Sequence, residues 1–530
     1  METFARNRTA RRHAELESSQ HAAFENALQF AESPDTPEAF RVDLERIRFS
    51  SYFARLSDVT QVVPQTGVGP VLHNRLTHSL KVSAVARVIA AQLAGHAAQW
   101  EAFERGETAE RDDTGRIVTT LGGCDTVVAQ AAAHAHDLGH PPFGHLGERV
   151  LDRLARTRLG LAEGFEGNAQ TFRILTHLDT LGRDFDGLNL TAATRAATLK
   201  YPWTRAAWAG IPLTDIEAAD RPRGAGINVE TGADKFSSYA LEAIEMEQVL
   251  AAFPAIPSGM QTVECAVMDL ADDIAYAVHD LDDFAKAGVL QRGEVLREFS
   301  AWLAVEGSLA VANEAELDTR EPGQSLELLW RRLQLKDSWI AEHDAFAEAV
   351  RIVAEEIGDG LLAVPYDGGI TSERAISGFT RRWIERLRSS IVVDEHPNVR
   401  GGYVRLNQRA WHEVMVLKFV HAHFVLERPE HALRQRGQSR IIESITLGLD
   451  AWLSDPVDAS HAPRSLLEWV EEGTQGLMEL RESRPDLLTG DTSIPGLIRQ
   501  GRTRAILDYV AGLSDQQAVQ VHAQLNGTVL

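Results

Sequence analysis

A single segment, His136–Glu148, constrains this chain more than any other stretch. It holds three histidines, two carboxylates and a Gly-His-Pro-Pro turn, and it follows the alanine-rich helical run Val127–Ala133. A His-Asp pair at the end of such a helix offers an imidazole nitrogen and a carboxylate oxygen to one metal ion, and these ligands suit a hydrolytic divalent metal. Proline cannot continue the helix, because it lacks the N–H and clashes with the preceding turn. The chain must turn there, which can bring His140 and His145 back over the metal.

Because an adjacent His-Asp pair is a weak signal by itself, the other candidate ligands matter. Upstream, His78 lies in the first turn of a predicted helix, for which Thr77 is the expected N-cap. Downstream, Asp272, Tyr276 and Asp280 follow one another at four-residue intervals and form one polar stripe on a predicted helix. A stripe of this kind usually faces solvent, but a tyrosine between aspartates amid alanine and isoleucine is less typical of a solvated face.

These residues resemble the motifs of a known family. The order of His78, the pair His136-Asp137, and Asp272 resembles the H…HD…D signature of HD-domain phosphohydrolases, and the fuller match resembles the deoxyguanosinetriphosphate (dNTP) triphosphohydrolases. Other segments that match the family in its own order are Arg46–Leu56, Thr60–Val62, Asn74–Leu80, Gly164–Gln170, Leu188–Thr191, Thr198–Trp203, Met268–Tyr276 and Asp508–Leu513. The resemblance implies a mainly helical, metal-dependent HD-domain fold.

The family reaction attacks the α-phosphorus of a dNTP and releases deoxynucleoside and intact triphosphate. By resemblance, His78, His136, Asp137 and Asp272 are the ligands of one divalent metal per subunit, which is Mg²⁺, Mn²⁺ or another transition metal. A metal of this kind can polarise a phosphoryl oxygen and acidify a water. The sequence has no glycine-rich phosphate loop, so phosphate chemistry must rest on a metal.

The departing 5′-oxygen needs a proton, and the resemblance makes His145 the general acid, since imidazole titrates near neutrality. Glu148 lies three residues further on, where a helical turn lets it orient His145 and support its protonated form. The alternative for His145 is a loop-capping role. His140 is expected to contact a phosphate or the leaving side, whereas His134 is expected to pack or to support the ligands from behind.

Four residues are candidate contacts for the phosphates or for other polar groups of the nucleotide. Arg75 resembles a nucleotide-contacting arginine of the family, and its planar guanidinium suits phosphate. Lys235 is expected to neutralise the β- or γ-phosphate. Gln61 and Asn168 are predicted polar contacts, but hydrogen bonding at a loop or helix end explains both of them equally well.

Two further candidates concern the sugar. Tyr276 and Asp280 lie one and two helical turns beyond Asp272, so both are expected to line the pocket. Tyr276 is expected to pack against the sugar and to exclude a ribose 2′-hydroxyl, which would make the pocket prefer deoxynucleotides. Asp280 is expected to bind the 3′-hydroxyl.

Helical signatures dominate the rest of the chain, because apolar residues recur at 3.6-residue spacing among alanine, leucine, glutamate and arginine. We expect an all-α fold with one small β-hairpin that joins Ile391–Val393 to Tyr403–Leu406. The polar stretch Arg105–Leu121 is a predicted break between helices. Residues 1–35 are expected to form a polar arm, residues 36–290 the HD-domain catalytic core, and residues 291–530 a helical region that packs on the core and contributes to oligomer contacts.

Acidic residues outnumber basic ones by 76 to 53, which gives a net charge of −23 and disfavours general nucleic-acid binding. A local basic patch could still bind single-stranded DNA weakly. The chain has no apolar run of about 18 residues and no signal-peptide core at its N-terminus. We therefore expect a cytoplasmic enzyme that makes no membrane contact, takes a dNTP substrate and, by resemblance, forms a homo-oligomer.

Two other interpretations stay open. The chain could be a different HD phosphohydrolase that acts on a nucleoside monophosphate or a guanosine polyphosphate, although the length of the match around His140 argues against this. It could also be a non-catalytic protein that senses nucleotides or single-stranded DNA, although the full ligand set and the His145–Glu148 pair argue against a decayed enzyme.

Overall fold

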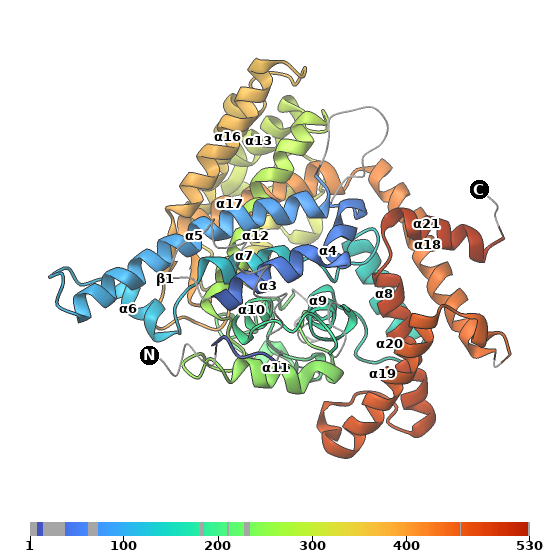
Figure 1. The fold of residues 1–530 in the computed structure, drawn as a ribbon. Helices are drawn as coiled ribbons and strands as arrows, with labels where there is room; N and C mark the ends of the chain where they lie inside the picture. The colour runs from blue at the N-terminus through green and yellow to red at the C-terminus, as the bar shows by residue number, and fades with distance from the viewer. Residues whose placement is uncertain are drawn as a thin grey trace.

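The structure is a computed structural model that describes residues 8–13, 38–61, 73–180, 185–208, 211–226, 234–455 and 457–527. Helices form nearly all of its regular structure (Figure 1). The described residues contain one sheet, in which β1 (Ile391–Val393) pairs antiparallel with β2 (Val404–Leu406). The expected all-α fold with one small β-hairpin is therefore confirmed.

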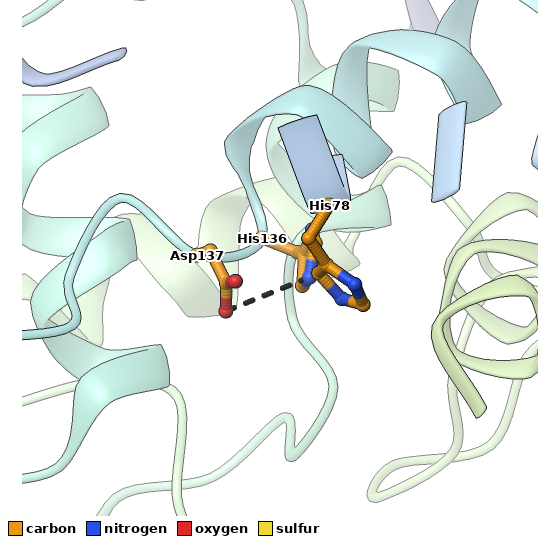
Figure 2. A group of neighbouring side chains, drawn as sticks. All are labelled: His78, His136 and Asp137. Carbon is orange, nitrogen blue, oxygen red and sulfur yellow. Dashed lines mark ion pairs between the residues drawn. The ribbon is translucent and has the colours of Figure 1, made fainter. Parts of the chain in front are cut away.

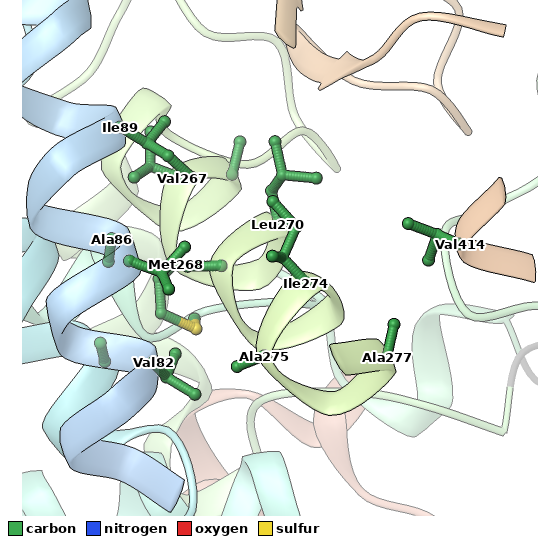
Figure 3. Packing of buried hydrophobic residues seen from close by; sticks show 14 of the residues in the cluster. Val82, Ala86, Ile89, Val267, Met268, Leu270, Ile274, Ala275, Ala277 and Val414 are labelled. Carbon is green, nitrogen blue, oxygen red and sulfur yellow. The ribbon is translucent and has the colours of Figure 1, made fainter. Parts of the chain in front are cut away.

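Three helices build the centre of the molecule: α5 (Arg75–Glu104), α7 (Thr126–Ala135) and α12 (Val263–Lys286). Alanine is frequent in α7 and α12, so their backbones can approach their neighbours closely while large side chains fill the gaps between them. Figure 3 shows Val82 and Ile89 of α5 facing Met268 of α12, with Val414 on the opposite side of α12. His78 lies in α5 and Asp272 in α12, and the pair His136-Asp137 directly follows α7, so the core itself positions the site.

Shorter helices surround this centre in the first half of the chain. Their bounds are α3 (Glu38–Phe49), α4 (Ser51–Arg55), α6 (Asp113–Thr120), α8 (His145–Thr157), α9 (Gly167–Arg173), α10 (Ala192–Ala197) and α11 (Ala243–Leu250). The 3₁₀ turns are Leu56–Asp58, Arg205–Trp208, Leu213–Asp215, Ala240–Glu242, Glu314–Glu316, Ala459–His461 and Pro485–Leu487. One-turn π-helices follow three α-helices at Ile174–Leu178, Glu356–Leu361 and Ala422–Leu426.

Helix α6 corrects the prediction that Arg105–Leu121 is a break. Its N-cap Asp112 accepts a hydrogen bond from Gly115 N, and the helix packs on α5. Gly115 makes this approach possible, because a Cβ there would lie 2.0 Å from the carbonyl oxygen of His96. The segment looked irregular because it is polar and short, and tertiary packing overrides that weak local preference.

The second half of the chain is helical, as expected. Its helices are α13 (Arg292–Leu309), α14 (Gln324–Lys336), α15 (His343–Glu355), α16 (Ile370–Arg388), α17 (Gln408–His421), α18 (Pro429–Ser454), α19 (Arg464–Ser483), α20 (Ile494–Ala511) and α21 (Asp515–Leu525). Helices α13 to α17 share one hydrophobic core with α5, α7 and α12, whereas α18 to α21 pack with α8 in a second cluster. The main core therefore continues across residue 290, where the sequence suggested a boundary.

Only residues 8–13 of the predicted N-terminal arm belong to the described ranges, and they pack on the core. Arg8 forms an ion pair with Glu264 of α12, and Arg11 lies 2.7 Å from Asp43 of α3. The rest of residues 1–35 lies outside the described residues. In the part of the chain that the structure covers, no helix has both the length and the apolar character that a bilayer crossing requires.

Candidate active site

The first predicted ligand, His78, lies at the start of α5. Asn74 is the N-cap of this helix, and its side chain exchanges hydrogen bonds with Thr77 in a capping box. The expectation that Thr77 is the N-cap is therefore wrong by one turn: Thr77 is the third helical residue. The prediction placed the cap at Thr77 because asparagine and threonine side chains both cap helices well. The helix begins after the earlier of the two residues, Asn74.

The pair His136-Asp137 lies where α7 ends, at the turn predicted from the proline residues. The Nδ1 of His136 is 2.7 Å from Ala133 O, so this ring nitrogen donates to the backbone and Nε2 is left as the ligand atom. The turn packs against α9, where Gly139 N donates to Thr171 Oγ1 at 3.0 Å. A Cβ on Gly139 would lie 2.1 Å from Gly167 O, so only glycine permits this close contact.

His78, His136 and Asp137 form a group whose ligand atoms all lie within 4.8 Å of one another (Figure 2). Asp272 of α12 completes it, because its Oδ1 lies 3.1 Å from His78 Nε2 and 3.5 Å from His136 Nε2. The His136 Nε2 is buried and has no hydrogen-bond partner within the described ranges. Two imidazole nitrogens and two carboxylate oxygens converge here, and this donor set fits a divalent metal.

Two cations hold the outer oxygens of these carboxylates. Arg75 Nη1 donates to Asp137 Oδ2 at 2.9 Å, and Lys200 Nζ donates to Asp272 Oδ2 at 2.9 Å. Burial alone would raise both carboxyl pKa values, but Arg75 brings the pKa of Asp137, and Lys200 that of Asp272, well below the ordinary range. Both aspartates are therefore ionised and oriented before any ligand binds.

Lys200 was not among the predicted site residues, although it lies in the Thr198–Trp203 motif. Its Nζ also pairs with Asp269 at 2.9 Å, and Asp269 in turn pairs with Arg223 at 2.8 Å. The motif could have drawn attention to Lys200. Its contact with Asp272 could not be foreseen, because it joins elements that meet only in the folded chain.

The predicted dyad forms at the start of α8. His145 Nδ1 lies 3.0 Å from Glu148 Oε2, and the His145 side chain is 62% exposed, whereas Glu148 is buried. Lys235 Nζ bonds Glu148 Oε1 at 2.6 Å and Glu166 Oε1 at 3.0 Å. Burial opposes ionisation of Glu148, but Lys235 and His145 bring its pKa well below the usual value. Glu148 is thus a carboxylate that can hold His145.

His140 connects the two groups. Its Nδ1 is 3.0 Å from Asp137 Oδ1, and its ring centre is 4.9 Å from that of His145. Burial and the neighbouring Arg75 lower the pKa of His140 to about 4, so the ring is neutral near pH 7. His134, by contrast, stacks on Phe53 at 5.1 Å between ring centres, which agrees with the packing role expected for it.

One cavity of about 490 Å³ opens over these groups. Its lining includes predicted metal ligands, catalytic histidines and substrate contacts: Gln61, Arg75, His78, His136, Asp137, His140, His145, Asn168, Lys235, Asp272 and Tyr276. Residues of α17 and α18 that the sequence did not single out also line the cavity: Lys418, His421, His431, Arg434, Gln435 and Gln438. The C-terminal half therefore forms part of the site in addition to supporting it.

The polar candidates differ in their surroundings. Asn168 Nδ2 donates to Glu166 Oε1 at 2.9 Å at the start of α9, which matches the helix-end alternative. Gln61 Oε1 is buried and has no hydrogen-bond partner among the described residues. Both side chains nevertheless lie on the cavity wall, so either can contact a ligand.

The two sugar candidates separate in the structure. Tyr276 lies on the cavity wall, with its ring 4.6 Å from that of His421. Asp280 is absent from the cavity lining and is buried beside His421, 3.8 Å from its Nδ1. A direct bond from Asp280 to a 3′-hydroxyl in this cavity is therefore not supported by the structure.

Comparison with known proteins agrees with this geometry. The HD domain family matches residues 75–221, which include three of the four predicted metal ligands. Divalent metals bind at HD domains, and the donor set described above fits that chemistry. The fold and the site together define an HD-domain phosphohydrolase.

Similarity to known sequences extends over nearly the whole chain. It is 30% identical to deoxyguanosinetriphosphate triphosphohydrolase-like protein 2 of Mesorhizobium japonicum, over 92% of this chain and 93% of that protein. It is 28% identical to the deoxyguanosinetriphosphate triphosphohydrolase-like protein of Streptomyces coelicolor, over 95% and 96% of the two chains. The chain is also 32% identical to the deoxyguanosinetriphosphate triphosphohydrolase-like protein of Azorhizobium caulinodans, over 69% of this chain and 79% of that protein. The chain belongs to this family of deoxyguanosinetriphosphate triphosphohydrolase-like proteins.

Proposed function

We propose that this protein hydrolyses dNTPs at the α-phosphorus to a deoxynucleoside and inorganic triphosphate, and that dGTP is among its substrates. The observation that carries the proposal is that the four-residue ligand group and His145, which Glu148 holds from its buried side, share one cavity of about 490 Å³. That volume is typical of sites for nucleotide-sized ligands. The names of the relatives support the choice of dGTP.

His78, His136, Asp137 and Asp272 would hold one divalent metal. When bound, the metal supplies Lewis-acid polarisation of the phosphoryl group and a more acidic water at neutral pH. The chain prepares this site in advance, because Arg75 and Lys200 keep both aspartates ionised, and the backbone fixes the ring of His136. Pre-orientation of this kind reduces the reorganisation needed during reaction.

His145 acts as the general acid for the departing 5′-oxygen. Its Nδ1 faces Glu148, so Nε2 is the nitrogen that carries the proton to the leaving group. Lys235 was expected at the β- or γ-phosphate, but its Nζ is engaged by Glu148 and Glu166. We therefore assign Lys235 to keeping Glu148 ionised, and through Glu148 to holding His145.

The test is to incubate the purified protein with each dNTP and a defined metal, and to resolve the products. Deoxynucleoside and tripolyphosphate are expected from the wild type. His136→Ala should lose both the bound metal and the hydrolysis, whereas the matched control His134→Ala should keep both. Release of pyrophosphate or monophosphate instead would contradict attack at the α-phosphorus with loss of triphosphate and would favour another HD phosphohydrolase.

The native metal, homo-oligomer formation, cytoplasmic location and weak binding of single-stranded DNA stay predictions. They rest on the family resemblance and the composition. Metal analysis of the purified protein and sedimentation in solution would test the first two directly.

A further inference from the structure

A carboxylate near the end of the chain is bonded to the turn that carries the proposed acid. Asp515 is the first residue of α21, and its side chain is half-buried. Its Oδ1 accepts a hydrogen bond from Phe143 N at 2.8 Å. Its Oδ2 accepts from Thr60 N at 3.1 Å and from Thr60 Oγ1 at 2.5 Å. One side chain therefore joins the last helix to two segments of the first half of the chain.

The turn at Phe143 has a backbone conformation that must be held in place. Its φ is +62°, and Phe143 and Asn189 are the two residues other than glycine with a positive φ within the described ranges. A bulky side chain is strained there, so the conformation persists only where the surroundings fix it. Gly144 follows as the N-cap of α8, and His145 is the first residue of that helix. The bond to Asp515 thus acts two residues before His145.

Close packing around the turn can pass a small displacement on to the start of α8. A Cβ on Gly147 would lie 2.2 Å from Pro142 O, and a Cβ on Gly144 would lie 2.6 Å from Arg75 Nη2. Interiors packed this closely transmit strain because they have few voids to absorb it. A shift of the Phe143 backbone therefore moves the residues that follow it.

The ring of His145 depends on this backbone for its position. Its side chain is 62% exposed, with Glu148 Oε2 3.0 Å from Nδ1 and the ring of His140 4.9 Å away between centres. Because solvent surrounds most of the ring, packing alone cannot fix it. Misplacement of a catalytic group by about 1 Å can lower a rate as much as 100-fold.

The same carboxylate also holds the strand-like segment beside the metal ligands. Thr60 lines the cavity and forms an isolated antiparallel bridge with Asn74, the N-cap of α5. Next to this bridge, Arg75 N donates to Val59 O at 3.2 Å. Asp515 thus ties the turn before His145 to the start of the helix that carries His78.

We propose that Asp515 is a positioning residue, which fixes the turn at Phe143 and so holds His145 at the correct place relative to the metal-ligand group. This inference rests on the proposed function. It gives the last helix of the chain a part in the reaction, although none of its residues lines the cavity.

The experiment measures kcat and KM for dGTP in Asp515→Asn, made both in the wild type and in His145→Ala. Asparagine keeps the size of the side chain but turns an NH₂ donor toward one of the N–H groups of Phe143 and Thr60. In the wild type, kcat should fall about tenfold with KM and metal content nearly unchanged, because a displaced acid affects the chemical step. In His145→Ala the same substitution should lower kcat less than about twofold, because the group that it positions is already absent.

This pair of backgrounds separates positioning from a general structural effect. A structural effect lowers kcat by the same factor with or without His145, and that result would overturn the inference, as would an unchanged kcat in Asp515→Asn. Asp515→Glu keeps both acceptor oxygens on a longer side chain and should recover part of the lost kcat, whereas Asp515→Ala should recover none.

A matched control lies on the same contact between α21 and the first half of the chain. Asp58 accepts hydrogen bonds from Ser514 Oγ and, at 3.4 Å, from Gln516 N. Among the described residues it has no hydrogen bond to the turn at Phe143. Asp58→Asn should therefore loosen the docking of α21 but keep kcat within about twofold of the wild type. An equal loss of kcat in Asp58→Asn and Asp515→Asn would assign the effect to docking and overturn the role of Asp515.

Failure of the proposed function has a different outcome. If the wild type hydrolyses no dNTP, the proposed function is refuted, and hydrogen–deuterium exchange of the purified protein then tests the contact. Gly144 N donates to Pro141 O at 3.0 Å, and Glu148 N donates to Gly144 O at 3.1 Å. Faster exchange of these two amides in Asp515→Asn, but not in Asp58→Asn, supports the inference. Equal exchange in Asp515→Asn and the wild type overturns it.

Discussion

Replacing Arg173 by methionine should destabilise the fold by about 3–5 kcal/mol, the usual cost of removing one partner from a buried ion pair. Arg173 lies in α9, with a side chain that is 2% exposed. Its Nε donates to Asp508 Oδ2 of α20 at 2.9 Å, and Nη1 donates to Glu242 Oε1. Both carboxylates are buried, so the methionine variant leaves two uncompensated groups away from water.

The loss should depend on pH in a defined direction. Burial raises the pKa of Glu242 even with Arg173 beside it, and removal of Arg173 would raise this pKa further. A carboxyl whose folded pKa exceeds its unfolded value contributes stability that is present below the unfolded pKa of about 4.3 and is lost as pH rises through the folded pKa. The deficit of Arg173→Met should therefore be larger at pH 8 than at pH 5.

Urea denaturation of wild type and variant at both pH values measures this deficit. Arg156→Met is the matched control, because Arg156 is 48% exposed and its 3.5 Å pair with Asp152 lies at the surface; its loss should cost less than about 1 kcal/mol. A deficit for Arg173→Met equal to that of the control, or unchanged between pH 5 and pH 8, would refute the reasoning.

Three further outcomes are expected. His145→Ala should lower kcat roughly 100-fold or more with metal content unchanged. The double variant with Glu148→Ala should lose less activity than the product of the two single fold-losses in kcat, and a loss equal to that product would show that the two residues act separately. Tyr276→Gly should narrow the preference for dGTP over GTP about tenfold, and equal turnover of GTP and dGTP by the wild type would remove the basis for a steric gate. Burial lowers the pKa of His279 to about 2, so its contribution to stability is complete above the unfolded pKa of about 6.5 and declines as pH falls below it. When the pH falls from 7 to 5, the free energy of unfolding should therefore decrease by about 2 kcal/mol less in His279→Gln than in the wild type, as measured by urea denaturation. Equal decreases in the two proteins would contradict a buried neutral ring.

The sequence alone was sufficient for features that depend on local spacing. His136 and Asp137 are neighbours, and His145 and Glu148 are three residues apart, so each pair is brought together by a single turn of chain. The hairpin of β1 and β2 was predictable for the same reason. The family motifs added the ligands His78 and Asp272. Local spacing could not predict that these two residues meet the pair His136-Asp137, because they lie on helices far apart in the sequence.

Tertiary packing alone decided the rest. Periodicity placed Tyr276 and Asp280 on one stripe of α12, but the packing of α17 against that stripe put His421 on the cavity wall and left Asp280 behind it. Lys200 reaches Asp272 across 72 residues of chain. Contacts of this kind depend on how helices far apart in the sequence cross. That crossing is set by the fit of many buried side chains at once, which no short motif records.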